Sequence, residues 1–202
     1  MFIRSRVLSL LMTTLACSAA WTSQAIGADL PNAEEAVVLV AKPQFRDPVY
    51  GETILIARPV GEGGHVGFIL NKPAHMNLGT LLSERDSRHS SVPLYLGGPA
   101  EEAAVFALVE TPQSPGRGSL QISSDLFLVI AQDTVTRVIE TEPEHARFFT
   151  GVVVWRPGEL ANEVKQGAWY VLSAERDLVL EQKTEGLWQR LVHLADLREN
   201  GI

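Results

Sequence analysis

Short motifs rich in residues that fix backbone shape recur in order along this chain of 202 residues. They read F-R-D-P-V-Y (45–50), G-F-I-L-N-K-P (67–73), L-G-G-P (96–99) and W-R-P-G-E-L (155–160), followed by G-A-W (167–169). Glycine permits positive φ and close backbone approach, proline fixes φ, and asparagine and aspartate form turns. None of these motifs contains a metal-ligand cluster or a phosphate-binding loop. They therefore constrain the architecture far more than they indicate a reaction.

The beginning of the chain has the three parts of a secretory signal peptide. Arg4 and Arg6 give a positive start, residues 7–20 are apolar, and Ser23-Gln24-Ala25 resembles an A-x-A cleavage site. The apolar run is shorter than the roughly 20 residues that a transmembrane helix needs. We therefore expect cleavage after Ala25, with Ala20 and Ala28 as alternatives. The expected organisation is a signal peptide (1–25), a flexible lead-in (26–36) and one domain (37–202), with no transmembrane helix after cleavage.

Export would place the mature protein in the periplasm or outside the cell. The only cysteine, Cys17, lies in the leader, and Thr14 occupies the position where a lipoprotein signal would have leucine. The sequence therefore weighs against a lipid anchor at Cys17. Without that cysteine, the mature chain has no disulfide, no thiol nucleophile and no thiolate metal ligand.

The charge balance is acidic. Removing Arg4 and Arg6 changes the formal net charge from −7 to −9 (−7 − 2), because residues 1–25 contain no acidic side chain. A net negative charge opposes non-specific binding to DNA. Direct binding to nucleic acid is therefore not expected, and the oligomeric state is not predicted.

Apolar runs and turn residues predict more strands than helices. Trp188, Leu191, Val192 and Ala195 have helical spacing, which predicts an amphipathic C-terminal helix. The remaining elements do not alternate regularly between strand and helix, which favours an α+β domain over a doubly wound sheet. Strands are expected at 37–41, 53–57, 66–70, 94–96, 105–109, 126–131, 148–154 and 169–172, and further helices after Asn77, from Asp133 to about Ile139, and from Pro157 to Gly167.

Taken together, the motifs resemble those of the AlgH/YqgE-like family. The matching order also includes V-F-x-L-x-E (105–110) and G-x-x-x-W-x-P-G-x-L-x-x-E (151–163), and the resemblance runs from about Val37 to Trp188. It implies a bacterial protein with a single α+β domain, in which a bulged, barrel-like, mainly antiparallel sheet packs with helices. Family members are often labelled transcriptional regulators, although the family has no recognised DNA-binding motif and no agreed reaction.

Two features of this chain depart from the family pattern. The family is conventionally cytosolic, whereas this chain begins with the signal-peptide pattern. The family also often has small residues where this chain has Val153 and Val154. A functional leader would weigh against a direct role in transcription.

Several motif positions allow either a functional or a structural interpretation. The turn before the helix expected at Pro157 could hold an anion, with Arg156 as a clamp. Alternatively, Pro157 starts the helix and Glu159 satisfies its positive end. Asp47 and Asn71 are typical turn-forming residues.

The other chemistry-bearing residues give no recognisable pattern. The G-E-G-G run (61–64) lacks the Lys and Ser/Thr of a phosphate-binding loop, and no serine lies in a G-x-S-x-G elbow. The five histidines do not have metal-ligand spacing. We expect no metal and no cofactor.

The resulting hypothesis is an exported, non-enzymatic protein that binds a small ligand or a protein partner, although these positions could equally be fold determinants. The alternatives are a cytosolic, transcription-linked regulator and a hydrolase whose carboxylates and histidines gather in one cleft. No catalytic residues are predicted. The candidate site residues are Asp47, Tyr50, Asn71, Gly97, Gly98, Trp155, Arg156 and Glu159.

Overall fold

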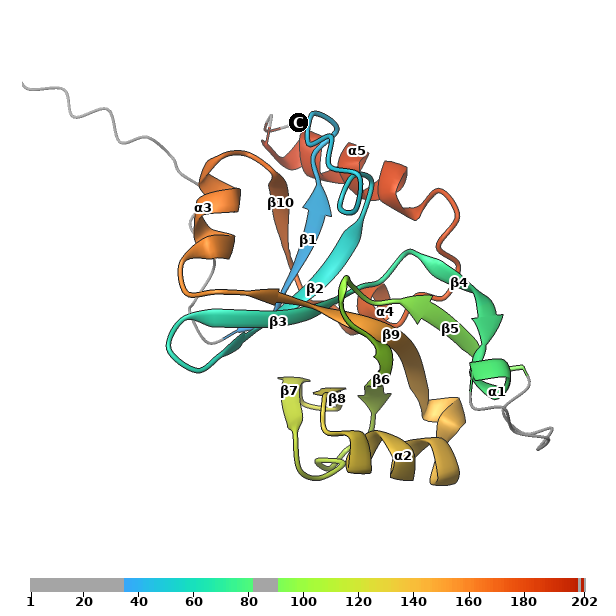
Figure 1. Cartoon of the computed structure of the whole chain (residues 1–202). Coiled ribbons are helices and arrows are strands. Elements are labelled where there is room, and N and C mark those ends of the chain that lie inside the picture. The colour runs from blue at the N-terminus through green and yellow to red at the C-terminus, as the bar shows by residue number, and fades with distance from the viewer. Residues whose placement is uncertain (1–34, 82–90, 200, 202) are drawn as a thin grey trace, which may run out of the picture.

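The computed structural model describes residues 35–81, 91–199 and 201 (Figure 1). The expected signal peptide and most of the expected lead-in lie outside the described residues. The signal-peptide and cleavage-site predictions are therefore not addressed by the fold. None of the described helices is long and apolar enough to cross a membrane.

A curled sheet of ten strands forms the body of the domain. Its main path follows the order β10-β1-β2-β3-β9-β6-β8-β7, and β4 and β5 branch from β9. The β5–β9 ladder is parallel, and the other described ladders are antiparallel. The strands are β1 (Val37–Ala41), β2 (Ile54–Val60), β3 (Gly64–Ile69), β4 (Pro73–Asn77), β5 (Pro93–Leu96), β6 (Ala100–Glu110), β7 (Ser119–Ser123), β8 (Leu126–Val129), β9 (Ala146–Trp155) and β10 (Trp169–Ser173).

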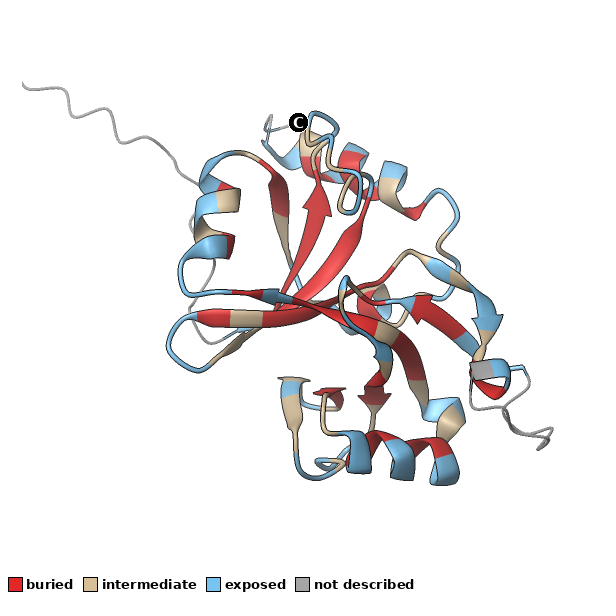
Figure 2. Cartoon of the chain, in the orientation of Figure 1, coloured by how far each residue is buried: buried red, intermediate tan, exposed pale blue. Residues whose placement is uncertain are grey.

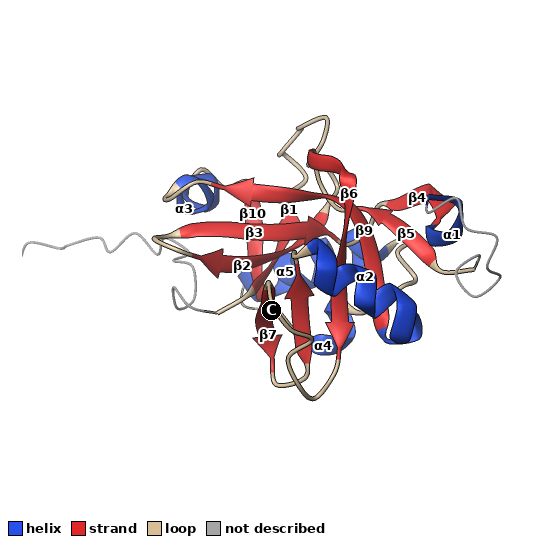
Figure 3. Cartoon of the chain, turned by 60° about the horizontal axis from the view of Figure 1, so that its bottom comes forward, coloured by secondary structure: helices blue, strands red, loops and turns tan. Residues whose placement is uncertain are grey.

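Helices cover both faces of this sheet: α4 and α5 pack against the interior of the curl, and α2 and α3 lie outside it. Figure 3 shows α2 beside β6 and β9. The helices are α1 (Leu78–Leu81), α2 (Gln132–Thr141), the 3-10 turn η1 (Pro143–His145), α3 (Glu159–Lys165), α4 (Arg176–Val179) and α5 (Leu187–Glu199). The register of the ladders shifts within β6, between Ala100 and Val105. The predicted α+β class, with a bulged and mainly antiparallel sheet, is thus confirmed.

Strand β1 shows why several strands are continuous apolar runs. All five of its residues are buried. Val38 and Val40 point into the interior of the curled sheet, whereas Val37 and Leu39 face an outer cluster under α3. A strand that is covered on both faces has no need for polar alternation. Figure 2 shows this burial along the central strands.

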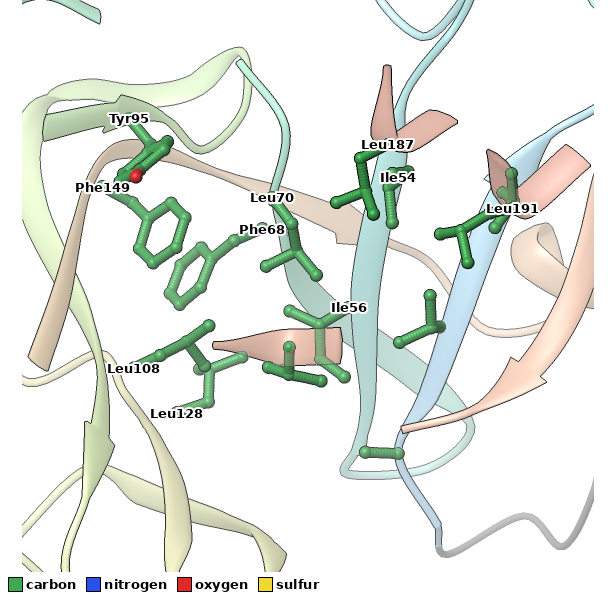
Figure 4. Packing of buried hydrophobic residues seen from close by; sticks show 14 of the residues in the cluster. Ile54, Ile56, Phe68, Leu70, Tyr95, Leu108, Leu128, Phe149, Leu187 and Leu191 are labelled. Atoms are coloured by element: carbon green, nitrogen blue, oxygen red, sulfur yellow. The ribbon is translucent and has the colours of Figure 1, made fainter. Parts of the chain in front are cut away.

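The interior of the curled sheet is filled by aromatic and aliphatic side chains (Figure 4). The rings of Phe68 and Phe149 stack with centroids 4.7 Å apart and an interplanar angle of 11°. Leu187 and Leu191 bring α5 onto the same core. The C-terminal helix expected from the spacing of its apolar residues is confirmed and covers this core.

Two strands were not predicted from the sequence. Most of β4 is exposed, and β7 is a short strand in which Leu120 and Ile122 are only partly buried. Both strands pair with one neighbour only in the described structure. Their positions follow from long-range pairing, which local composition does not reveal.

Candidate functional site

The tryptophan motifs meet around one glutamate. The indole Nε1 of Trp155 donates to Oε2 of Glu163 at 3.1 Å, and Nε1 of Trp169 donates to the same oxygen at 2.8 Å. Both tryptophans are buried, with 4% and 3% of their surface exposed. We call these three residues the Trp–Glu cluster. They join the end of β9, α3 and the start of β10, so their contacts explain the spacing of the two motifs.

The turn between β9 and α3 is satisfied by its own residues. The backbone N–H of Arg156 donates to Oε2 of Glu159 at 2.8 Å, and Gly158 adopts a positive φ of 77°. Leu160 points into the outer core. The Glu159 carboxylate therefore closes the turn that leads into α3. The helix begins at Glu159, directly after Gly158, so the prediction that Pro157 starts it is wrong. The side chain of Arg156 is exposed.

The loop that carries the first motif is held by Asp47 and Asn71. Oδ1 of Asp47 accepts hydrogen bonds from the backbone N–H groups of Val49 and Tyr50, both at 2.8 Å. Asn71 accepts from the N–H of Ile54 at 2.8 Å and donates to the carbonyl of Glu52 at 2.9 Å. Both side chains thus form the turns expected of them, and together they fix the backbone from residue 47 to residue 54.

Tyr50 connects this loop to the Trp–Glu cluster. Its ring packs edge-on against Trp169, with centroids 6.3 Å apart. Partial burial raises the pKa of the Tyr50 phenol, and the negative charges of Glu163, Asp47 and Glu159 raise it further. Tyr50 therefore stays protonated at neutral pH and acts as a packing residue with a polar end.

Gly97 and Gly98 pack directly against the backbone of β9. A Cβ atom on Gly97 would come within 2.4 Å of the Gly151 carbonyl oxygen, and one on Gly98 within 2.4 Å of the Val152 carbonyl carbon. Gly151 itself has a φ of 72°. Two backbones approach here more closely than any side chain would allow. The L-G-G-P motif is thus required for packing at the junction of β3, β5 and β9.

Immediately beside this junction, parts of three sequence motifs line one open pocket of about 460 Å³. Leu96 and Val49 are unusual apolar residues here, because 47% and 40% of their surfaces are exposed. Nζ of Lys72 donates to the Val49 carbonyl at 2.5 Å. We call this cavity the motif pocket; its lining residues are Val49, Ile69, Lys72, Leu96, Gly98, Pro99, Glu102 and Thr150.

The structure does not gather the predicted site residues into one site, and only Gly98 of them lines the motif pocket. Gly98 lines the motif pocket, whereas Trp155 and Glu159 belong to the cluster side of the molecule. Asp47 and Asn71 do not line the motif pocket; they hold the chain next to Val49 and Lys72, which do. Gly97 packs behind it.

Sequence reasoning missed the residues that give the motif pocket its chemistry. Lys72 lies inside a recognised motif, between Asn71 and a proline, and could have been selected as its only charged member. Leu96 ends a strand, but nothing local indicated its exposure. Glu102 lies outside every motif, and no signal in the sequence points to it.

Arg147 is another residue that the sequence did not single out. It is 3% exposed, donates to the carbonyls of Val179 at 2.7 Å and Leu70 at 2.8 Å, and its guanidinium lies 4.3 Å from the centroid of the Tyr95 ring. Burial lowers its pKa. Arg147 thus joins β9 to the ends of β3 and α4 from within the core.

The hydrolase alternative requires carboxylates and histidines in one cleft, and one pocket of about 540 Å³ does combine Glu110, Glu142, Glu144 and His145. The candidates from the motifs, Asp47 and Glu159, do not line it. His65, His75, His145 and His193 lie on β3, β4, η1 and α5 respectively. Asp47 and Glu159 both accept hydrogen bonds from nearby backbone N–H groups. Within residues 35–81, 91–199 and 201, no group of three or more His, Cys, Asp and Glu side chains is placed to hold a metal ion.

Comparison with known proteins agrees with the motifs. Residues 38–199 match the model of the AlgH-like family, DUF179. A UPF0301 protein of Ruegeria pomeroyi is 30% identical over 167 residues, which cover 79% of this chain and 90% of that protein. A UPF0301 protein of Thermobifida fusca is 32% identical over 166 residues, covering 77% and 83%. The function of the UPF0301 family is uncharacterised.

Solved structures share the same architecture. The solution structure of AlgH from Pseudomonas aeruginosa superposes with a TM-score of 0.65 at 25% identity and covers 79% of this chain and 86% of that one. A crystal structure of a Corynebacterium diphtheriae protein gives a TM-score of 0.61 at 21% identity, covers 81% and 87%, and supports the fold alone. On the motifs, the fold and the family model, this chain belongs to the AlgH-like family.

Proposed function

We propose that this protein is an exported, non-enzymatic binding protein, whose motif pocket holds a small amphipathic molecule with an anionic group. One observation carries this proposal. Three motifs that are distant in sequence contribute Val49, Lys72, and Leu96 with Pro99 to a single pocket. Packing of the core does not require exposed apolar side chains at this position, whereas a ligand would cover them.

The apolar walls favour the body of such a molecule. Val49, Leu96 and Pro99 surround the cavity, and buried Ile69 forms part of its floor. Its volume of about 460 Å³ falls within the range typical of small-molecule sites, roughly 300–1,000 Å³. Covering the exposed parts of Leu96 and Val49 would contribute about 25 cal/mol for each Å² of apolar surface removed from water.

Lys72 favours an anionic group at one end of the ligand. Its ammonium is held by the Val49 carbonyl, and an ammonium has three N–H donors, so two remain for a ligand. In the described structure, Lys72 and Glu102 do not form a salt bridge with each other. Glu102 is exposed, so water and salt screen its charge more strongly than they screen the half-buried Lys72.

The walls of the pocket are held in place before any ligand binds. Asp47 fixes the turn that presents Val49, Asn71 fixes the chain before Lys72, and the close approach at Gly98 fixes the turn that presents Pro99. A preformed site loses less conformational entropy on binding than a flexible one. A structural role for Asp47 and Asn71 is therefore compatible with a binding role for Val49 and Lys72 in the same motifs.

Octanoate and uncharged octanol test this pocket by NMR titration. We expect octanoate to shift the methyl resonances of Val49 and Leu96 and to bind about tenfold more tightly than octanol, a difference of about 1.4 kcal/mol. Lys72→Gln should remove that preference, whereas Leu96→Ser should weaken both probes. Val154→Thr is the matched control, because Val154 is a 58% exposed strand residue outside the motif pocket. Equal binding of both probes to the wild type, or an unchanged preference in Lys72→Gln, would disprove the anion-binding role.

The export part of the proposal rests on the leader pattern of residues 1–25. Cells that express the full chain should be fractionated, and the intact mass of the product should be measured. A periplasmic product that begins near Ile26 is expected. An uncleaved cytosolic product would contradict export and favour the regulatory alternative, for which salt-dependent DNA binding is the direct test.

A further inference from the structure

A second pocket, of about 580 Å³, lies on the loop of the first motif and on the beginning of α5. Lys42, Pro43, Phe45, Arg46, Asp47, Pro48, Gly51, Glu52 and Trp188 line it. We call it the charged pocket. The motif pocket shares none of these lining residues. Val49 is the only residue of the first motif that lines the motif pocket.

The charged pocket contains a cationic and an anionic side chain that form no salt bridge with each other in the described structure. Lys42 is already occupied, since its Nζ binds Glu199 at 2.9 Å and lies 4.4 Å from the centroid of the Tyr170 ring. Arg46 and Glu52 are exposed, and within the described residues neither side chain forms a salt bridge or a hydrogen bond. One guanidinium and one carboxylate therefore remain for a ligand.

The backbone around Glu52 is held in an uncommon conformation. Glu52 has a φ of 57°, in the left-handed region that disfavours residues with a side chain. The hydrogen bond from Asn71 to the Glu52 carbonyl and the bond from the Gly51 N–H to the Asp47 carbonyl hold this turn. Strained non-glycine residues concentrate at functional sites. Here the held backbone sets the direction of the Cα–Cβ bond of Glu52, whose carboxylate forms no hydrogen bond or salt bridge within the described residues.

The remaining walls are rigid and partly aromatic. Trp188 donates its Nε1 hydrogen to the Ala41 carbonyl at 2.8 Å, so the position of its ring is fixed. Phe45 packs edge-on against Trp169, with centroids 5.1 Å apart. Pro43 and Pro48 restrict the loop further. Such walls suit a small molecule with a short apolar part between charged groups.

We propose that the charged pocket binds a small zwitterion, an amino acid or a dipeptide. The free ammonium and carboxylate groups of the ligand would be the groups recognised. Glu52, together with Oδ2 of Asp47, which accepts no hydrogen bond within the described residues, holds the ammonium. Arg46 pairs with the carboxylate, an interaction that suits the fork of a guanidinium. The aromatic edge of Trp188 covers the side chain.

Dialanine and its two blocked forms test this site on protein purified from cells that express the full chain. The readouts are titration calorimetry and the indole N–H resonance of Trp188. Dialanine should bind at least tenfold more tightly than N-acetyl-dialanine and than dialanine amide. Arg46→Gln should abolish the preference over the amide, and Glu52→Gln should abolish the preference over the acetylated form.

Matched controls separate this site from non-specific charge effects and from the motif pocket. Lys165→Gln and Glu140→Gln remove exposed charges outside the charged pocket and should leave dialanine binding unchanged. Arg46→Gln and Glu52→Gln should still bind octanoate, which shows that the fold and the motif pocket are intact. The inference is overturned if the wild type gives no dialanine signal at millimolar concentration, if blocked peptides bind equally well, or if both variants keep their preferences.

Discussion

The Trp–Glu cluster and the motif pocket both consist largely of residues from the sequence motifs. They differ in how far these side chains are buried and paired within the chain. In the cluster, the indole N–H groups of Trp155 and Trp169 are paired and both rings are buried. In the motif pocket, Leu96 and Val49 expose nearly half of their surfaces. The sequence placed Trp155 and Gly98 in one candidate site, whereas the structure places them in these two different regions.

The difference shows how a fold determinant can be separated from a candidate binding residue. A side chain whose polar atoms and apolar surface are satisfied within the chain needs no ligand to explain it. Lys72 donates one hydrogen bond to the fold and retains others, and Leu96 is left uncovered. Breaking each region should therefore change stability in one case and ligand binding in the other.

The largest expected effect is on the cluster. Trp155→Ala should lower the free energy of unfolding by roughly 3–5 kcal/mol, because it removes a buried ring and leaves a cavity. Chemical denaturation measures this loss, and octanoate affinity per folded molecule should be unchanged. A stable variant that has lost octanoate binding would show that Trp155 is a binding residue and not a determinant of stability.

Gly98→Ala tests the junction behind the motif pocket. Its Cβ would lie 2.4 Å from the Val152 carbonyl carbon, so the backbone must shift. We expect a loss of stability of about 1–3 kcal/mol, as for other overpacked positions, together with weaker octanoate binding. Unchanged stability in thermal denaturation would show that the close approach of the two backbones is dispensable.

Glu163→Gln should have a smaller effect than Trp155→Ala. The amide oxygen can still accept hydrogen bonds from the indoles, but it is a weaker acceptor than the charged carboxylate. The free energy of unfolding should therefore fall by about 1–2 kcal/mol. The indole N–H resonances of both Trp155 and Trp169 should move in NMR spectra. If only one of them moves, the glutamate does not bridge the two rings.

Tyr50 links the two regions and should make stability depend on alkaline pH. Its pKa is raised in the folded state, so the stability that it contributes is complete below its unfolded pKa of about 10 and is lost as pH rises through the folded value. Tyr50→Phe should therefore lose stability less steeply above about pH 10. Tyr170, whose pKa is raised by burial and by Asp196, acts in the same direction and is present in both proteins. Equal slopes for the two proteins would show that folding does not raise the pKa of Tyr50.

The sequence predicted local turns better than sites formed by segments that are distant along the chain. The turn at Asp47 and the role of Glu159 were predictable because their hydrogen bonds join residues two or three positions apart. The motif pocket was not predictable, because its walls come from segments that only the sheet topology brings together. Arg147 was missed for a similar reason, since both carbonyls that it binds are distant in sequence.

The central claim is that the exposed motif residues Val49, Lys72 and Leu96, rather than buried motif residues such as Trp155, bind the ligand. Octanoate affinity and unfolding free energy should be measured together for wild type, Leu96→Ser, Lys72→Gln and Trp155→Ala. The account predicts stability losses of about 1.5 kcal/mol or less and weaker binding for the two pocket variants, and a larger stability loss with unchanged binding for Trp155→Ala. Pocket variants that keep full octanoate affinity would contradict it.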